Sequence, residues 1–402
     1  MTTRATDLMR VDHDQLVRAL HLARHGLGRT HPNPMVGAVV VDTAGQVVGE
    51  GWHDHYGADH AETVALAQAS QRAQGGTLYV TLEPCNHAGQ TPPCTAGILA
   101  AGIKRVVYGM ADPNPKVAGG GAKALAEAGL EVMPWPDDEL KRSIQALNEA
   151  FVHACTSQTP FVLLKLAATI DGKTATRSGH SQWITSPKSR AMVHQWRAES
   201  DGILSTATTV LADNAALTVR DAELPPAMAM AMAPDRVILD RRGRLLDQLS
   251  LKLFEPDERG GPITLVVGTR FASQRYEAMC NAHGYGLIVL PDDGRHLDLK
   301  QLMQVLGSGE DRLTQLMVEA GPTLAGQLLD QGLVQRLVVM TGPLLLGDAQ
   351  GAPMVVTQPV SRIDEAVPLT LMNVWAGDDS NIIADYRLVS GCCSDGLHHK
   401  AH

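Results

Sequence analysis

Hydrophobic residues in the first part of the chain recur alternately with helix and strand periodicity. Leu16, Leu20, Ala23 and Leu27 recur at three- and four-residue steps, which predicts an amphipathic helix over 12–28. The β-branched run 36–41 and the segment 46–52 predict a hairpin. Helices are then expected over 59–74, 94–101 and 119–129, and strands over 77–82, 105–110 and 130–134. This alternation favours a largely buried sheet with helices on both faces.

A second α/β pattern begins after a connecting helix over 140–152 and the polar, Pro-terminated stretch 156–160. Strands are expected over 161–167, 202–205, 236–240, 263–267, 286–290 and 313–319, with helices over 186–199 and from about 323 to 331. The Met/Ala/Pro-rich stretch 225–234 shows no clean period and is expected to be a loop. The predicted domains are 1–155 and 160–389, followed by a frayed tail, 390–402.

Composition narrows the class of protein. The 402 residues are 44% hydrophobic and 19% charged, which is typical of a soluble globular protein. A net charge of −9 and a pI of about 5.9 argue against nucleic acid or anionic membrane as partner. No signal peptide or membrane span is expected, so we expect a cytoplasmic protein. Six cysteines in such a chain favour metal binding or free thiols over a disulfide framework.

One stretch has the components of a catalytic zinc site. His60, Cys85 and Cys94 supply one imidazole and two thiols, and Glu62 lies two residues from the imidazole. Three protein ligands leave a fourth position for water, and Glu62 is suited to move protons as a general acid/base. His60, Glu62 and Cys94 fall at expected helix starts, where the partial positive charge of the helix favours thiolate over thiol.

The alternative is a structural zinc site. Such sites usually present four protein ligands, often in close Cys pairs, whereas eight residues separate the two cysteines here. His87 remains a possible fourth ligand on spacing alone. His53 and His55 are expected to be exposed or hydrogen-bonded rather than ligands, although either is near enough in sequence to a strand end to contact a substrate.

The second half has a weaker chemical signal. A strand ending at Glu319 leads through Ala320-Gly321-Pro322-Thr323 into a helix, and the free N–H groups of a helix start suit a phosphate. This turn lacks the Gly-x-Gly-x-x-Gly fingerprint, so a turn without a ligand is equally compatible with it. Basic residues on the helix 186–199 are expected to be solvated.

The motifs of the first half carry a resemblance. His60-Ala61-Glu62 with Pro84-Cys85 and Pro93-Cys94 resembles the zinc deaminases of the cytidine deaminase superfamily. Together with Asn33-Pro34-Met35-Val36-Gly37, the phrase Thr91-Pro92-Pro93-Cys94 is similar to bifunctional riboflavin-biosynthesis proteins, which join a pyrimidine deaminase to a reductase. The resemblance implies a three-layer α/β/α deaminase domain, with Asn33 at the substrate. Members of that family often carry Arg where this chain has Gln90.

The second half resembles the reductase of the same family, through Asp171-Gly172-Lys173, Leu211-Ala212-Asp213-Asn214 and Glu319-Ala320-Gly321-Pro322-Thr323. The resemblance implies a dihydrofolate-reductase-like α/β fold that uses NADPH. It places the cofactor at Ala167, Trp183, Thr209, Asp213, Gly321, Pro322, Thr323, Leu324, Ala325, Gly326 and Gln327. It places the substrate at Ser181, Arg197, Leu217, Arg220 and Glu319, with the arginines on a 5′-phosphate.

Lys165 and Asp213 are the candidate proton donors for the reduction. Arg241 stands where the family resemblance leads us to expect a small polar residue near the cofactor, so no cofactor contact is assigned to it.

The sequence therefore predicts a two-step enzyme with Zn²⁺ and NADPH. The first domain would deaminate 2,5-diamino-6-(5-phosphoribosylamino)pyrimidin-4-one, and the second would reduce its ribosyl group to a ribityl chain. A homo-oligomer without nucleic-acid or membrane partners is expected. Two rivals stay open at this point: a nucleoside or tRNA deaminase with an accessory domain, and a zinc-stabilised binding protein without chemistry.

Overall fold

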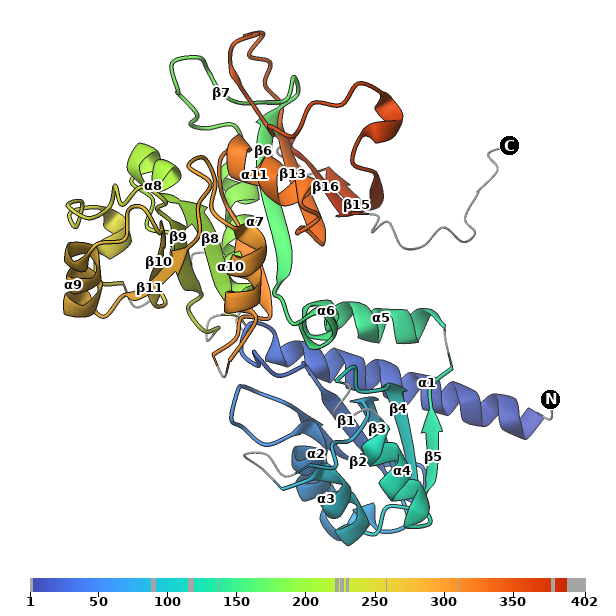
Figure 1. The fold of residues 1–402 in the computed structure, drawn as a ribbon. Helices are drawn as coiled ribbons and strands as arrows, with labels where there is room; N and C mark the ends of the chain where they lie inside the picture. Colours follow the sequence, from blue (N-terminus) through green and yellow to red (C-terminus); the bar gives the residue numbers. More distant parts are fainter. Residues whose placement is uncertain are drawn as a thin grey trace, which may run out of the picture. The chain divides into compact units, whose positions relative to one another are not determined.

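The computed structural model describes residues 3–87, 92–114, 119–136, 138–220, 224, 228, 231–257, 259–309, 311–376 and 380–388. The chain divides into two compact units (Figure 1). The first contains Met1–Pro160, Leu224–Met232 and Gln304–Gln315, and the second contains Phe161–Glu223, Ala233–Met303 and Leu316–His402. Gln90, most of 225–230 and the tail 390–402 lie outside the described residues.

The first unit is built on a five-stranded sheet with the order β2-β1-β3-β4-β5. Its strands are β1 (Gly37–Val41), β2 (Val47–Trp52), β3 (Thr77–Leu82), β4 (Arg105–Met110) and β5 (Glu131–Pro134). Strand β1 is antiparallel to both β2 and β3, whereas β3, β4 and β5 run parallel. Its helices are α1 (Thr3–Ala23), α2 (Ala61–Ala69), α3 (Cys94–Ala100), α4 (Gly120–Glu127), α5 (Glu139–Leu147) and α6 (Glu149–Ser157).

Alternating residues of β1 supply two hydrophobic cores, one on each face of this sheet. Ala38 and Val40 face the core that contains residues of α2, α3 and α4. Val39 and Val41 face the core that contains residues of α1 and α5. All four side chains are buried, as expected when successive side chains of a strand point to opposite faces. The layers are therefore helices, sheet, helices (Figure 1).

A buried ion pair joins α1 to the sheet. Asp12 is 1% exposed and accepts hydrogen bonds from both terminal nitrogens of Arg105, each at 2.7 Å. The Tyr79 hydroxyl also donates to Asp12, at 2.8 Å. Three donors thus satisfy a carboxylate that would be costly to bury alone.

The second unit is built on a nine-stranded sheet with the order β11-β10-β9-β8-β12-β6-β13-β16-β15. These strands are β6 (Phe161–Thr169), β8 (Gly202–Thr206), β9 (Asp235–Leu239), β10 (Ile263–Gly268), β11 (Gly286–Leu290), β12 (Gln315–Val318), β13 (Arg336–Gly342), β15 (Leu369–Ala376) and β16 (Ile382–Leu388). Strand β16 is antiparallel to its neighbours β13 and β15. Strands β11, β10, β9, β8 and β12 run parallel to one another, so their carboxyl ends lie along one edge of the sheet.

Helices cover this sheet over separate hydrophobic clusters. They are α7 (Pro187–Glu199), α8 (Ala207–Asp213), α9 (Gln274–His283), α10 (Leu299–Leu306) and α11 (Pro322–Asp330). Val193 and Trp196 of α7 pack with residues of β6, β12 and β13. Val210 of α8 and Tyr276 of α9 pack with residues of β8, β9 and β10. A small two-stranded sheet pairs β7 (Lys173–Ala175) with β14 (Ala352–Pro353).

Most elements expected from the sequence are present, with two kinds of difference. The single helix expected over 140–152 is two helices, α5 and α6, which meet at Asn148. Asn148 is buried, and its side-chain amide forms two hydrogen bonds with the backbone of Met35. The sequence expectations also omit α8, α9, α10 and the strands β13, β15 and β16. Within the described part of the chain, no helix combines the length and apolar character needed to cross a bilayer.

Candidate active sites

The imidazole and the two thiols predicted as metal ligands lie together in the first unit. His60 is the residue before α2, Cys94 is the first residue of α3, and Cys85 lies on the loop after β3. One ligand atom from each lies within 4.8 Å of the others. Among the described residues, neither His87 nor Glu62 belongs to this group. The donor set is therefore one nitrogen and two sulfurs, as in zinc sites that keep an open position.

Two glycines of β2 fix how closely α2 lies against the sheet. A Cβ atom at Gly49 would collide with the carbonyl oxygen of Ala65, and one at Gly51 with the carbonyl oxygen of Ala61. Both carbonyls belong to α2, whose start carries His60 and Glu62. Strand β2 thus contributes no ligand but sets the position of the helix that does.

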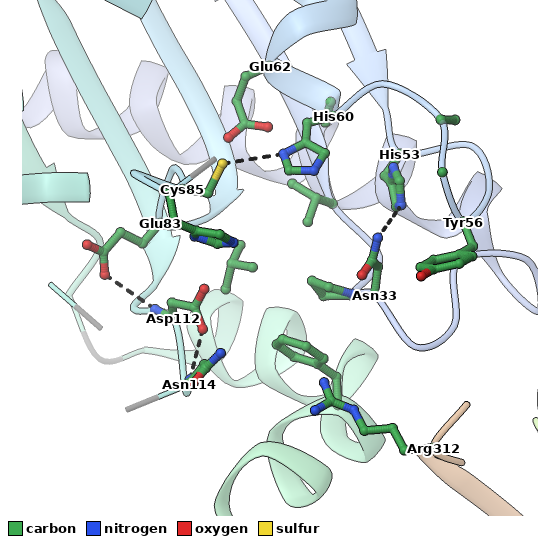
Figure 2. A pocket seen from close by; sticks show the side chains of 18 residues that line it. Asn33, His53, Tyr56, His60, Glu62, Glu83, Cys85, Asp112, Asn114 and Arg312 are labelled. Atoms are coloured by element: carbon green, nitrogen blue, oxygen red, sulfur yellow. Dashed lines mark hydrogen bonds between the residues drawn. The ribbon is translucent and has the colours of Figure 1, made fainter. Parts of the chain in front are cut away.

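Glu62 points to the same place from the first turn of α2 (Figure 2). Its side chain is buried, and burial raises the pKa of its carboxyl. The pKa of Cys85 is lowered, first by its hydrogen bond with Cys94, while the pKa of Cys94 is raised, first by its hydrogen bond with Cys85. A divalent cation bound by these two neighbouring sulfurs would favour the thiolate form of both. The residues fit a zinc ion.

A cavity of about 310 Å³ opens beside this cluster. Asn33, the predicted substrate contact, lines it and lies 3.2 Å from Nε2 of His53 (Figure 2). His53 is buried and also hydrogen-bonded to the backbone carbonyl of Asp59, so it is a hydrogen-bonded histidine rather than an exposed one. Burial lowers the pKa of His53.

Glu83 organises the opposite wall. Its buried carboxylate accepts hydrogen bonds from the backbone N–H groups of Gly119 at 3.1 Å and Ala122 at 3.0 Å, at the start of α4. A longer one, 3.4 Å, comes from Asp112 N. Sequence reasoning missed this residue, although its place directly before the Pro84-Cys85 motif was a usable signal.

Arg312 was also missed. It is half-buried and belongs to the segment Gln304–Gln315 of the first unit. Among the described residues that line the cavity, it is the only Lys or Arg (Figure 2). Nothing in the local sequence distinguishes it from a surface arginine.

The second unit brings together an acid and a base that the sequence leaves far apart. Arg197 of α7 and Glu319, which follows β12, form a two-pronged ion pair, with Nη2 donating to Oε2 at 3.0 Å and Nε donating to Oε1. Both are largely buried, which corrects the expectation that arginines on this helix are solvated. Lys165 is nearby and half-buried, and desolvation lowers the pKa of its amine.

The other predicted substrate residues flank this pair. The backbone carbonyl of Thr218, between Leu217 and Val219, accepts from Arg197 at 2.8 Å. Leu217 is buried with φ of 56°, Arg220 is exposed, and Ser181 is half-buried. Within the described part of the chain, no hydrogen bond joins Ser181 to Arg197 or Glu319, so the predicted role of Ser181 at the substrate stays a prediction.

A second cavity, of about 370 Å³, contains part of the predicted cofactor set. Thr209, Gly321, Pro322, Thr323, Leu324 and Gln327 line it. Ala325 and Gly326 are buried within α11, and Ala167, Trp183 and Asp213 are absent from the described lining. Trp183 is 64% exposed, and the guanidinium of Arg190 lies 4.1 Å over its ring. Asp213 is exposed at the end of α8, and partial desolvation raises the pKa of its carboxyl.

Comparison with known proteins gives a family match in each half of the chain. Residues 9–110 match the cytidine and deoxycytidylate deaminase zinc-binding region, and residues 160–383 match the RibD C-terminal domain. The riboflavin biosynthesis protein RibD of Escherichia coli is 42% identical over 348 residues, which are 85% of this chain and 90% of that protein. Its counterpart in Aquifex aeolicus is 40% identical over 84% of this chain and 88% of that protein.

Solved structures give the same result. The RibD structure of Acinetobacter baumannii is 35% identical, covers 95% of this chain and 99% of that chain, and superposes with a TM-score of 0.82. A diaminohydroxyphosphoribosylaminopyrimidine deaminase/5-amino-6-(5-phosphoribosylamino)uracil reductase from Thermotoga maritima is 32% identical, covers 94% and 99%, and has a TM-score of 0.79.

These likenesses confirm the expected fold class, a cytidine-deaminase-like α/β/α domain plus a dihydrofolate-reductase-like α/β domain. They also confirm a bifunctional enzyme of riboflavin biosynthesis, a hydrolase that acts as a zinc-dependent deaminase and an oxidoreductase that uses NADPH. The chain belongs to the RibD family of riboflavin biosynthesis proteins.

Proposed function

We propose that this chain deaminates 2,5-diamino-6-(5-phosphoribosylamino)pyrimidin-4-one in residues 1–155 and reduces the product's ribosyl group in residues 160–389. The supporting observation is the cluster of His60, Cys85 and Cys94 within 4.8 Å, with a buried carboxylate beside it. The proposal also includes a cytoplasmic, homo-oligomeric enzyme, and both of these properties rest on the sequence alone.

In the deaminase site, His60, Cys85 and Cys94 would hold zinc, which when bound supplies activation of a water molecule. Glu62 takes a proton from that water and gives it to the departing amine, so that water adds at C2, the C–N bond breaks and ammonia leaves. Its raised pKa suits a group that must both accept and donate a proton near neutral pH. Asn33, held by its hydrogen bond with His53, orients the pyrimidine.

The phosphate of this substrate needs a cation near the same cavity. Arg312 is the one described Lys or Arg in the lining, and Glu62, Glu83 and Asp112 give the remaining lining an acidic character. We therefore assign the 5′-phosphate to the guanidinium of Arg312, which can form two parallel hydrogen bonds with it.

In the reductase site, NADPH when bound supplies the hydride that goes to C1′ of the ribose. Thr209 and the turn 321–327 hold the dinucleotide, together with Ala167, Trp183 and Asp213. Arg197, Arg220, Ser181 and Leu217 hold the substrate, and Glu319 keeps Arg197 in place. Lys165 lies near Glu319, and desolvation lowers the pKa of its amine. It is the group we expect to give a proton to the ring oxygen as the ribose opens.

The test separates the two half-reactions. Zinc-loaded protein should release ammonia from the diaminopyrimidinone without NADPH, and should oxidise NADPH only with the deaminated product. Removal of zinc by a chelator should abolish the first reaction and spare the second. Release of no ammonia by zinc-loaded protein would contradict the assignment of the first site, and absence of NADPH oxidation with the deaminated product would contradict the second.

A further inference from the structure

The cofactor cavity of the second unit is lined by four arginines that the known reaction does not account for. Arg241, Arg242 and Arg244 follow β9, and Arg295 follows β11. The turn into α11 follows β12 and forms another wall. Because these strands run parallel, the cavity lies at the edge where their carboxyl ends meet, which is where open α/β sheets bind ligands.

The charge of this lining is one-sided. No Asp or Glu is found among its described residues, whereas four arginines and His296 are. A cavity with this composition suits a ligand with more than one phosphate group. The N–H groups at the start of α11 suit one of these phosphates, and Gly321 lets it approach the backbone closely.

The four arginines differ in what they already contact. Arg241 donates to the carbonyl of Gly294 at 3.0 Å and to Asp292 at 3.4 Å. Arg244 donates to the hydroxyl of Thr208 at 2.7 Å. For the guanidinium groups of Arg242 and Arg295, the described part of the chain provides no hydrogen bond or ion pair, and both residues are exposed. Two arginines thus shape the wall, and two are available to a ligand.

We propose that Arg242 and Arg295 bind the 2′-phosphate of NADPH and so make this chain select NADPH over NADH. The inference rests on the dinucleotide site proposed above. The pyrophosphate is common to both cofactors and is assigned to the start of α11, so the unpaired cations are left for the phosphate that only NADPH carries. Two guanidinium groups in the lining of one cavity match a dianion that offers three acceptor oxygens.

The test measures binding of two small probes to the full-length protein by calorimetry. Adenosine 2′,5′-bisphosphate carries the 2′-phosphate and 5′-AMP does not. The unaltered protein should bind the bisphosphate at least tenfold more tightly. Each of Arg242→Ala and Arg295→Ala should weaken bisphosphate binding about tenfold, and the double variant should lose the preference, with 5′-AMP binding unchanged. Arg242→Lys should restore part of it, because the charge returns without the planar fork.

Arg275→Ala is the matched control, since Arg275 is exposed in the same unit and pairs with Asp247 outside the cavity. It should bind both probes as the unaltered protein does. In steady-state assays, the double variant should raise the KM for NADPH and leave that for NADH and both kcat values in place. If the double variant keeps its preference for the bisphosphate, the inference is wrong and the dinucleotide site stands. If the unaltered protein binds neither probe nor NADPH, the dinucleotide site itself is wrong.

Discussion

His60 and Cys94 of the deaminase site are 34 positions apart in the sequence, whereas Arg197 and Glu319 of the reductase site are 122 positions apart. The first site is placed by two helix starts and one loop that follow one another along the chain. The second depends on the sheet order, because β12 inserts between β8 and β6 and brings Glu319 to α7. Chemistry can therefore be deduced from residue spacing in the first unit, but only from topology in the second.

The largest effect is expected from Glu62→Gln, which removes the proton carrier and keeps the side-chain shape. Ammonia release should fall about 10³-fold, in the range typical of general acid/base catalysis. Zinc content by atomic absorption and NADPH oxidation with the deaminated substrate should stay at their normal values. Glu127→Gln, an exposed change on α4, is the control. Retention of ammonia release by Glu62→Gln would show that Glu62 is not the proton carrier of the deaminase.

Glu319→Gln breaks the ion pair of the reductase site. It leaves the buried guanidinium of Arg197 without its carboxylate, so the free energy of unfolding should fall by about 3–5 kcal/mol and reduction should be lost. The exposed pair of Arg275 and Asp247 gives the matched comparison, for which Asp247→Asn should cost less than about 1 kcal/mol. Urea unfolding curves measure both. Equal costs for the two variants would contradict the structural importance of the buried pair.

Arg312→Ala tests whether the deaminase site also depends on a residue that lies far from its metal ligands in the sequence. Loss of the one described cation in the cavity should raise the KM of the deaminase about 10- to 100-fold, the range for a lost charged hydrogen bond to phosphate. The kcat should change little, and Arg312→Lys should recover part of the loss. Arg72→Ala, which removes an exposed arginine of the same unit, should have no effect on KM. An unchanged KM in Arg312→Ala would place the phosphate elsewhere.

The smallest expected effect is a pH-dependent loss of stability at His194 of α7, which lies near the pair of Arg197 and Glu319. Burial, followed by the charges of Arg197 and Arg220 and opposed by Glu319, lowers its pKa from 6.5 to about 4. Its Nδ1 also accepts a hydrogen bond from the backbone N–H of Arg220 at 3.0 Å, which protonation of that nitrogen would remove. The unfolded chain therefore binds more protons between pH 6.5 and pH 4, and stability is lost as the pH falls through this window.

In His194→Asn the side-chain oxygen can take the place of Nδ1 without titrating. Between pH 7.5 and pH 5, the melting temperature of the unaltered protein should fall a few degrees further than that of the variant. Scanning calorimetry of both at several pH values makes the comparison. Parallel curves for the two proteins would mean that His194 is as easily protonated in the folded chain as in the unfolded chain.

The sequence could predict elements and residues that depend on nearby positions, but not those that depend on the order of the strands. The strands β3 and β4 are found at the positions expected from their apolar runs, and the helix starts at His60 and Cys94 are where breakers and small residues indicate them. Arg312 could not be found, because its neighbours have no catalytic motif and only the fold brings it to the cavity. The burial of Arg197 was likewise unpredictable, since its partner is supplied by a distant strand.

The sequence also contains a helical pattern that the predictions above do not include. Helix α10 has Leu299, Leu302, Met303 and Leu306 at helical spacing, and all four are buried. Strand β15 is the reverse case, because it lies at the sheet edge with every residue exposed, so no buried face gives it a diagnostic alternation.

Because Gly49 and Gly51 pack against α2, two distances in the deaminase site are set by two different elements. The distance between the imidazole of His60 and the carboxyl of Glu62 is encoded within α2, whereas the depth at which both lie relative to Cys85 and Cys94 is encoded in β2. A methyl group added at position 51 would displace the ligand and the acid as one body. Metal affinity can therefore be tuned from a strand without ligands while the spacing between acid and ligand is preserved.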